Sequence, residues 1–236
     1  MKKTLWIAMV GALVASVVAA SAQEVLSANA VGYIKKEVPP QGKLVAITIP
    51  LEAMGDSPDV VFTNSSVAAE ADPGSLAYFW EPVLQSWRGS TKSTKDSRWD
   101  GAAVSKVMDV GEMFFLKSPA SAVNPKDVTI TGQVPATNPP VVVRVQGNLS
   151  AIGNPYPVDF IFTNSTLATG AQPGSLAYFW DAGLQSWRGS TKSTKDSRWD
   201  GAAVGKTVSA GEGFFLKDIT TAAEREWSAE KFYTWP

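Results

Sequence analysis

Leu84–Val104 reads LQSWRGSTKSTKDSRWDGAAV, and the same sequence recurs without a change at Leu184–Val204. Outward from this block, a constant offset of 100 residues extends the match from Phe62–Lys117 to Phe162–Lys217, through the shared motifs FTNS, PGSLAYFW, GE and FFLK. A duplicated segment of this length is long enough to form a structural unit of its own. The sequence therefore predicts two tandem homologous repeats.

Short runs of β-branched and aromatic residues, separated by Gly, Pro, Asn and Asp, predict an all-β protein. Ser75–Trp80 and Gln85–Ser90 have a four-residue connection and predict a β-hairpin, repeated in the second copy. The Pro-rich connection Pro135–Pro140 is short, so we expect two β-sandwich-like repeats packed together about a pseudo-two-fold axis. The other expected strands are Lys43–Ile49, Glu112–Lys117, Val128–Gly132 and Val141–Val145.

The end of the second repeat differs from that of the first. The first repeat continues through DVTITGQVP from Asp127, whereas the sequence after Lys217 has no such continuation. We therefore expect a rebuilt C-terminal strand that pairs with the N-terminal segment Val25–Val38.

The N-terminal segment 1–22 has the features of a secretory signal peptide. Lys2 and Lys3 precede an apolar run, Leu5–Ala20, and small residues end the segment. The apolar run is shorter than the roughly 20 residues that a membrane-spanning helix needs, and no second candidate follows. We expect an exported protein, extracellular, at the cell surface or periplasmic, without a membrane span in the mature chain. The expected boundaries are 1–22 for the signal peptide, 23–137 for the first repeat and 138–236 for the second.

The composition excludes several classes of function. The chain contains no His and no Cys, which removes Ser-His-Asp and Cys-His catalysis and metal sites built from imidazole or thiolate. The carboxylates Asp96, Asp100 and Glu112 recur in the second copy, but no pattern sets two of them apart as acid and base. A formal net charge of −1 gives no reason to expect nucleic acid as a partner. We expect a non-enzymatic protein without metal or cofactor.

The segment Asp96–Gly101 has a partial likeness to a calcium-binding loop, with Asp at its first and fifth positions and Gly at the sixth. However, Arg98 occupies the position of a third oxygen ligand, and Val107 stands where Glu should close the loop. A turn at Asp100 and Gly101 is the favoured interpretation.

The second repeat carries GNPYPVDFIFTNS from Gly153, then GSLAYFWD, QSW and GEGFFLK. This order resembles a β-rich module of secreted bacterial surface proteins that contain two such units, and the NAVGY and TGQVP motifs of the chain fit the same resemblance. The resemblance implies β architecture and export but no particular activity. The first repeat departs from the pattern at Ile47–Pro50, which replaces GNPYP, and at Met113, which replaces the small Gly213.

The unbroken identity of the central block has two explanations. Recent recombination between the copies would produce it without any function. Alternatively, the block is a duplicated binding surface, in which flat aromatic rings lie beside charged hydrogen-bonding groups, a mixture that suits a sugar ring. We expect Trp80 and Trp180 in the core, Trp87 more often core than exposed, and Trp99 as the best exposed platform.

The favoured function is a surface or adhesion-type binding protein, with a polysaccharide or another surface protein as partner. The alternative is a structural or assembly component of the envelope or extracellular matrix that takes no small ligand; the oligomeric state is left open. The candidate ligand-binding residues are Trp87, Arg88, Lys92, Lys95, Arg98, Trp99, Asp100, Trp187, Arg188, Lys192, Lys195, Arg198, Trp199 and Asp200.

Overall fold

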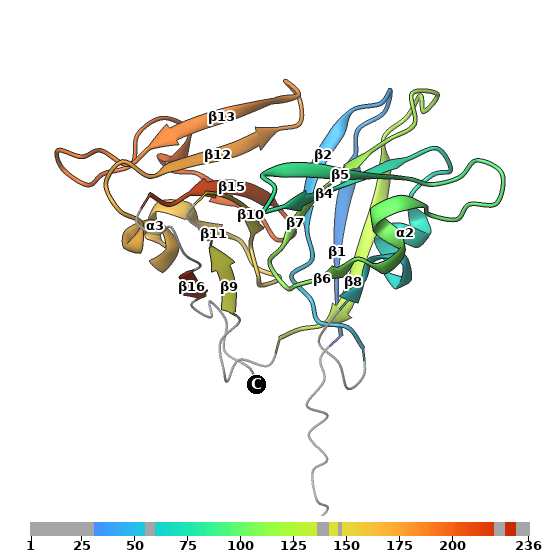
Figure 1. Cartoon of the computed structure of the whole chain (residues 1–236), viewed down its shortest axis with the longest axis horizontal. Coiled ribbons are helices and arrows are strands. Elements are labelled where there is room, and N and C mark those ends of the chain that lie inside the picture. The colour runs from blue at the N-terminus through green and yellow to red at the C-terminus, as the bar shows by residue number, and fades with distance from the viewer. Residues whose placement is uncertain (1–30, 55–59, 136–141, 146–147, 220–224, 230–236) are drawn as a thin grey trace, which may run out of the picture.

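The computed structural model describes residues 31–54, 60–135, 142–145, 148–219 and 225–229. These residues form mainly β-strands in several antiparallel sheets, with few and short helices (Figure 1). The all-β expectation is therefore confirmed. The expected signal peptide and the junction between the repeats lie outside the described residues.

The elements follow one another in the same order in the first half, up to residue 135, and in the second half, from residue 142. The first half contains β1 (Val31–Val38), β2 (Leu44–Thr48), β3 (Val60–Val61), η1 (Phe62–Asn64), α2 (Ser66–Glu70), β4 (Leu76–Glu81), β5 (Ser86–Thr91), η2 (Gly101–Ser105), β6 (Val107–Met108), β7 (Met113–Lys117) and β8 (Lys126–Gln133). The second half contains β9 (Val142–Val145), β10 (Leu149–Gly153), β11 (Phe160–Ile161), η3 (Phe162–Asn164), α3 (Thr166–Gly170), β12 (Leu176–Asp181), β13 (Ser186–Thr191), η4 (Gly201–Ala203), β14 (Thr207–Val208), β15 (Gly213–Lys217) and β16 (Arg225–Ser228).

Each half is built on one four-stranded antiparallel sheet, in the order β2-β7-β4-β5 and β10-β15-β12-β13. Strands β4 and β5 form the expected hairpin, in which Trp80 lies opposite Trp87. Two-stranded pairs complete each half. The expected pairing of the C-terminal strand with the N-terminal segment is wrong, because β16 pairs with β9 and β1 pairs with β8.

Two five-residue helices, α2 and α3, were not expected from the sequence. Helix α2 begins after Ser65, whose hydroxyl oxygen accepts a hydrogen bond from the Ala68 N–H, and Ser165 does the same for Ala168. A helix of little more than one turn shows no apolar periodicity, so only the N-cap serine marks it in the sequence.

The two faces of each four-stranded sheet cover different cores. Alternation along β4 places Ala77 and Phe79 in the core of the first half, and Trp80 on the opposite face. The opposite faces of both sheets form a third cluster, which belongs to both halves. Its buried members are Ala46, Trp80, Met113, Phe115, Ala151 and Phe215.

Reciprocal hydrogen bonds join the halves around this third cluster. The Trp80 indole N–H donates to the Leu149 carbonyl at 2.9 Å, and the Gln85 side chain accepts from the Leu149 N–H at 3.0 Å. The second half makes the matching contacts on the first half through Trp180, Gln185 and Leu44. A side-chain amide can meet both main-chain groups of one residue in this way, so each hairpin tip is fixed to the other half.

The edges of β2 and β10 are also covered by the opposite half. The Thr48 N–H donates to the Gly211 carbonyl at 3.1 Å, and the Gly153 N–H donates to the Gly111 carbonyl at 2.8 Å. These contacts cover the inner edge of each four-stranded sheet. An open strand edge is a site for unwanted pairing with another chain, and the contact between the halves prevents it here.

Candidate functional site

The central block begins at the contact between the two halves. The Trp87 ring centroid lies 5.6 Å from that of Phe215 in the other half, and the Trp187 centroid lies 5.5 Å from that of Phe115. Both tryptophans are half-buried members of the shared aromatic cluster. Arg88, the next residue, is exposed. The two candidate residues therefore differ: Trp87 joins the halves, whereas Arg88 is free to meet a partner.

Lys92 and Lys192 were expected in an exposed loop, but both are buried. The Lys92 Nζ donates to the carbonyls of Ala68, Ala69 and Ala71 at 2.7 to 2.8 Å, at the C-terminal end of α2. Burial lowers the pKa of the Lys92 ammonium, an effect that Lys126 increases and Asp72 opposes. Because all three of its N–H groups already have acceptors, this side chain fastens the loop to the helix and is not available to a ligand.

Trp99 and Trp199 were expected as exposed platforms, but both pack against the core. The Trp99 indole N–H donates to the Ala68 carbonyl at 3.0 Å, and its ring lies edge-on to Phe62 at 5.1 Å. Trp199 makes the same contacts and is only 9% exposed. The prediction of a flat exposed ring is therefore wrong for both copies, because the indole closes the end of the loop against the short helix.

Between these two anchors, Ser93–Arg98 forms a compact turn. The Ser93 N–H donates to the Arg98 carbonyl at 2.7 Å, and the Ser93 hydroxyl oxygen accepts from the Asp96 N–H at 3.3 Å. Ser97 adopts a positive φ of 59°. The same contacts recur in the second copy. The turn therefore holds its own shape, and Ser93, which the candidate set did not include, is the residue that organises it.

The charged side chains of the turn point into solvent. The Arg98 side chain is 87% exposed, and its Nε lies 4.0 Å from the Asp96 carboxylate. A pair at this distance in water contributes little. Hydrogen bonding to Ser93 and to the Arg98 main chain holds the pKa of Asp96 below its ordinary value. Lys95 is exposed beside it.

Asp100 has a structural role at the base of the loop. Its carboxylate accepts from the Thr91 N–H at 2.6 Å, and its own N–H donates to the Thr91 carbonyl at 3.1 Å. Asp200 does the same for Thr191. In the part of the chain that the structure describes, no group of three or more acidic side chains is arranged to hold a metal ion.

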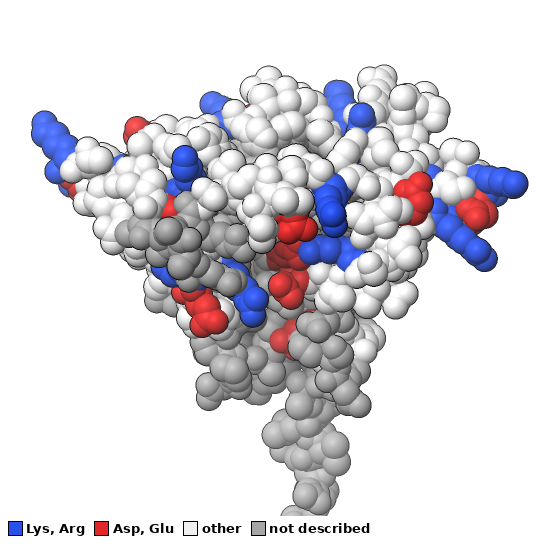
Figure 2. Space-filling view, viewed as in Figure 1, with Lys and Arg blue, Asp and Glu red and all other residues white. Residues whose placement is uncertain are grey.

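The two loops project in different directions. Figure 1 shows the loop after β5, in green, at one end of the longest axis, and the loop after β13, in orange, at the other. Figure 2 shows Lys or Arg side chains beside an Asp or Glu at both ends. The exposed charged residues of the identical blocks are Arg88, Lys95, Asp96, Arg98 and Asp100, with Arg188, Lys195, Asp196, Arg198 and Asp200.

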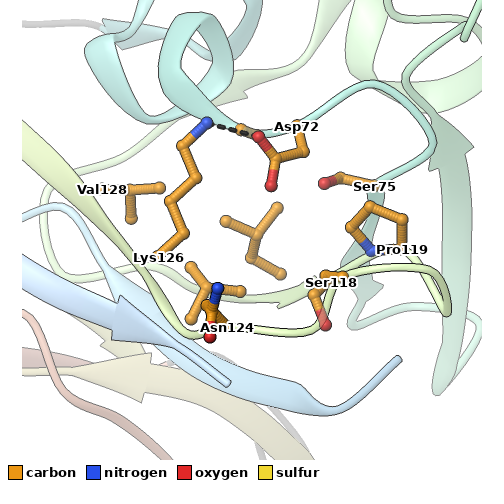
Figure 3. Close-up of a pocket in the computed structure, with 11 residues that line it drawn as sticks. Asp72, Ser75, Ser118, Pro119, Asn124, Lys126 and Val128 are labelled. Carbon is orange, nitrogen blue, oxygen red and sulfur yellow. Dashed lines mark hydrogen bonds and ion pairs between the residues drawn. The ribbon is translucent and has the colours of Figure 1, made fainter. Parts of the chain in front are cut away.

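A small pocket lies in the first half between α2 and the start of β8. Lys126 forms an ion pair with Asp72 on its wall, and Ser75, Ser118 and Asn124 also line it (Figure 3). It has room for about one water molecule. It is therefore too small for a sugar or another organic ligand.

No family model matches the chain, and neither a curated protein nor a solved structure is significantly similar to it. Among the described residues, no helix has the length and apolar character needed to span a membrane.

Proposed function

We propose that the protein is an exported, non-enzymatic, adhesion-type binding protein that bridges polysaccharide chains through two identical loops. The observation that carries the proposal is the duplication of one self-supporting charged turn, Ser93–Arg98 and Ser193–Arg198, at opposite ends of the molecule. Two sites that cannot reach the same short ligand favour cross-linking of a polymer.

The organisation behind this function is part of the proposal. Two homologous β-sandwich-like repeats, 23–137 and 138–236, pack about a pseudo-two-fold axis after removal of the signal peptide 1–22. Support comes from the equal order of elements, from the reciprocal contacts around the shared cluster, and from the basic start and apolar run of the N-terminal segment. A two-fold relation places equivalent loops on opposite sides of the molecule when they lie far from the axis, as the loops after β5 and β13 do (Figure 1).

The chemistry of the exposed residues supports one class of polysaccharide as the ligand. Because the Trp99 and Trp199 rings are packed inward, the loops offer Lys95 and Arg98 to a ligand rather than an aromatic face. Guanidinium and ammonium groups bind carboxylates and phosphates by charge-assisted hydrogen bonds. The proposed ligand is therefore an acidic polysaccharide, bound at each end with Asp96 accepting from its hydroxyl groups.

Charge reversal of both loops tests this function. We expect Arg98→Glu/Arg198→Glu to weaken retention of Gln23–Pro236 on uronate-containing polysaccharides by at least about tenfold. The single variants Arg98→Glu and Arg198→Glu are each expected to bind a polysaccharide chain through the remaining loop without cross-linking two chains. The measurements are affinity electrophoresis for binding and turbidity for cross-linking. The matched control is Lys35→Glu/Lys217→Glu, which makes the same charge change at exposed residues outside the loops. Equal binding by the loop variant and the control would contradict the proposal.

The second candidate function is a structural component that assembles without a ligand. The outer edges of the two four-stranded sheets, formed by β5 and β13, favour it. In that case the protein would form concentration-dependent multimers in the absence of polysaccharide.

A further inference from the structure

The pocket of the first half is lined by a serine whose copy in the second half has two hydrogen-bond partners. Ser75 lines the pocket, and Ser175 is its copy at the offset of 100 residues. The Ser175 hydroxyl donates to the Asp218 carboxylate at 3.4 Å and accepts from the Ile219 N–H at 3.4 Å. Both serines are buried, and Ser75 is only 2% exposed. A buried hydroxyl group at this place is therefore expected to have a partner in each half.

The first half replaces both of these partners. Ser118 stands at the position of Asp218. Pro119, which has no N–H group, stands at the position of Ile219. The two replacements line the pocket together with Ser75. The pocket therefore lies where the second half has a carboxylate and a main-chain donor.

Each half has one ion pair at this place, but the acidic residue differs in position. In the first half, Lys126 pairs with Asp72 on the pocket wall (Figure 3). In the second half, Gln172 replaces Asp72, and the Arg225 Nη2 lies 2.6 Å from the Asp218 carboxylate. Lys126 and Arg225 are the first residues of β8 and β16. Both halves therefore combine one cation with one anion here, and only the second half places the anion beside the serine.

The buried lysine at the base of each loop indicates that the two ion pairs are equivalent. Burial lowers the pKa of the Lys92 ammonium, and Lys126 and Asp72 act on it in opposite directions. Burial also lowers the pKa of Lys192, and the second ion pair acts on it in the same two ways. Ala71, whose carbonyl accepts from the Lys92 Nζ at 2.7 Å, also lines the pocket. The pocket therefore lies directly behind the attachment of the loop after β5.

We propose that this pocket binds one ordered water molecule, which hydrogen-bonds to the Ser75 hydroxyl and to the Asp72 carboxylate. Figure 3 shows the Ser75 hydroxyl oxygen and the Asp72 carboxylate oxygen that is not bonded to Lys126, both directed to the interior of the pocket. The pocket has room for about one water molecule, and a buried water needs at least two polar partners. Because Lys126 and Asp72 balance each other, a neutral ligand fits this place better than an ion. This inference goes beyond the proposed function, because it involves no polysaccharide.

Crystal structures of the mature protein test this site directly. Wild-type protein is expected to show a water molecule within hydrogen-bond distance of Ser75 Oγ and the Asp72 carboxylate, and no water between Ser175 and Asp218. Ser75→Val replaces the hydroxyl by a methyl group that fills the pocket, so this variant is expected to lose the water. Ser175→Val is the matched control, because it makes the same change where the serine binds a carboxylate, and it should keep the water of the first half. A wild-type pocket without ordered water, or a water that persists in Ser75→Val, would overturn the proposal.

Transfer of the second-half residues gives an independent test in solution. The variant Asp72→Gln/Ser118→Asp/Lys126→Arg copies the second half at three positions, and its new carboxylate is expected to bind Ser75 in place of the water. Oxygen-17 relaxation dispersion counts the long-lived water molecules of a protein. The count should fall by one water molecule in this variant and in Ser75→Val, and should not change in Ser175→Val. An unchanged count in both first-half variants would contradict the proposal.

Discussion

Replacing Gly213 by Met is expected to destabilise the protein strongly, and removing Met113 from the same chain is expected to recover most of the loss. A Cβ atom at Gly213 would lie 2.2 Å from the Met113 Cγ and 2.7 Å from its Cβ. Met113 is fully buried, and the two residues occupy equivalent positions of the two halves. One large and one small residue therefore share a single space between the halves.

The magnitudes follow from overpacking and from cavity formation. Gly213→Met forces a second side chain into filled space and should cost about 3 kcal/mol or more. Met113→Gly leaves a cavity and a freer backbone and should cost about 3 to 5 kcal/mol. The double variant fills the same space from the opposite side, so we expect a favourable coupling of at least about 2 kcal/mol. Urea unfolding of the three variants measures it.

Met108 and Val208 provide the matched control. They are also equivalent positions and are buried, but each lies in the separate core of its own half. The exchange Met108→Val/Val208→Met should therefore give additive changes in the free energy of unfolding, within about 0.5 kcal/mol. Additivity at 113 and 213 as well would show that the two residues do not share one space.

Thr48 and Gly153 repeat this arrangement. A Cβ at Gly153 would lie 2.8 Å from the Thr48 Cβ and 2.5 Å from the Glu212 carbonyl oxygen. Both differences between the repeats that stand out in the sequence, Thr48 against Gly153 and Met113 against Gly213, therefore meet across the contact between the halves. A two-fold relation brings equivalent residues close together where they lie near the axis. At these two positions there is room for only one side chain, so the two residues differ in size.

The strands and hairpins could be predicted from the sequence, whereas the shared cluster could not. Alternation in LAYFWE shows that Phe79 and Trp80 face opposite sides of β4. It does not show what the face that carries Trp80 packs against. Only the fold brings Trp80 within 4.9 Å of Phe215. The pairing expected for the C-terminal strand was wrong for a similar reason. Strand β16 follows a stretch of sequence without a match in the first repeat, and the sequence predicted no neighbour for its partner β9.

The candidate loop was only partly predictable. Lys92 lies among Ser, Thr, Lys and Asp residues, a composition typical of a solvated loop, and its burial depends on the carbonyls of α2. Trp99 was chosen as exposed because the surrounding residues are polar, but its ring fills the space above Phe62. The candidate residues that the structure leaves on the surface are Arg88, Lys95, Arg98 and Asp100, with their copies in the second half. Their charge opposes burial.

Replacing the buried Lys92 by Met is expected to lower the free energy of unfolding by about 3 kcal/mol or more. Methionine keeps the length and apolar stem of the side chain but removes all three donors, so the carbonyls of Ala68, Ala69 and Ala71 lose the Nζ contacts at 2.7 to 2.8 Å. Trp99 also donates to Ala68, and this contact remains.

Lys95→Met is the matched control, because it makes the same chemical change three residues away, at an exposed position of the same loop. It should change the free energy of unfolding by no more than about 0.5 kcal/mol. Urea midpoints with equal slopes would report the difference between the two variants. Equal stability of Lys92→Met and Lys95→Met would contradict this prediction. Water would then have to replace the ammonium at all three carbonyls, and Trp99 and Asp100 would be enough to hold the loop in position.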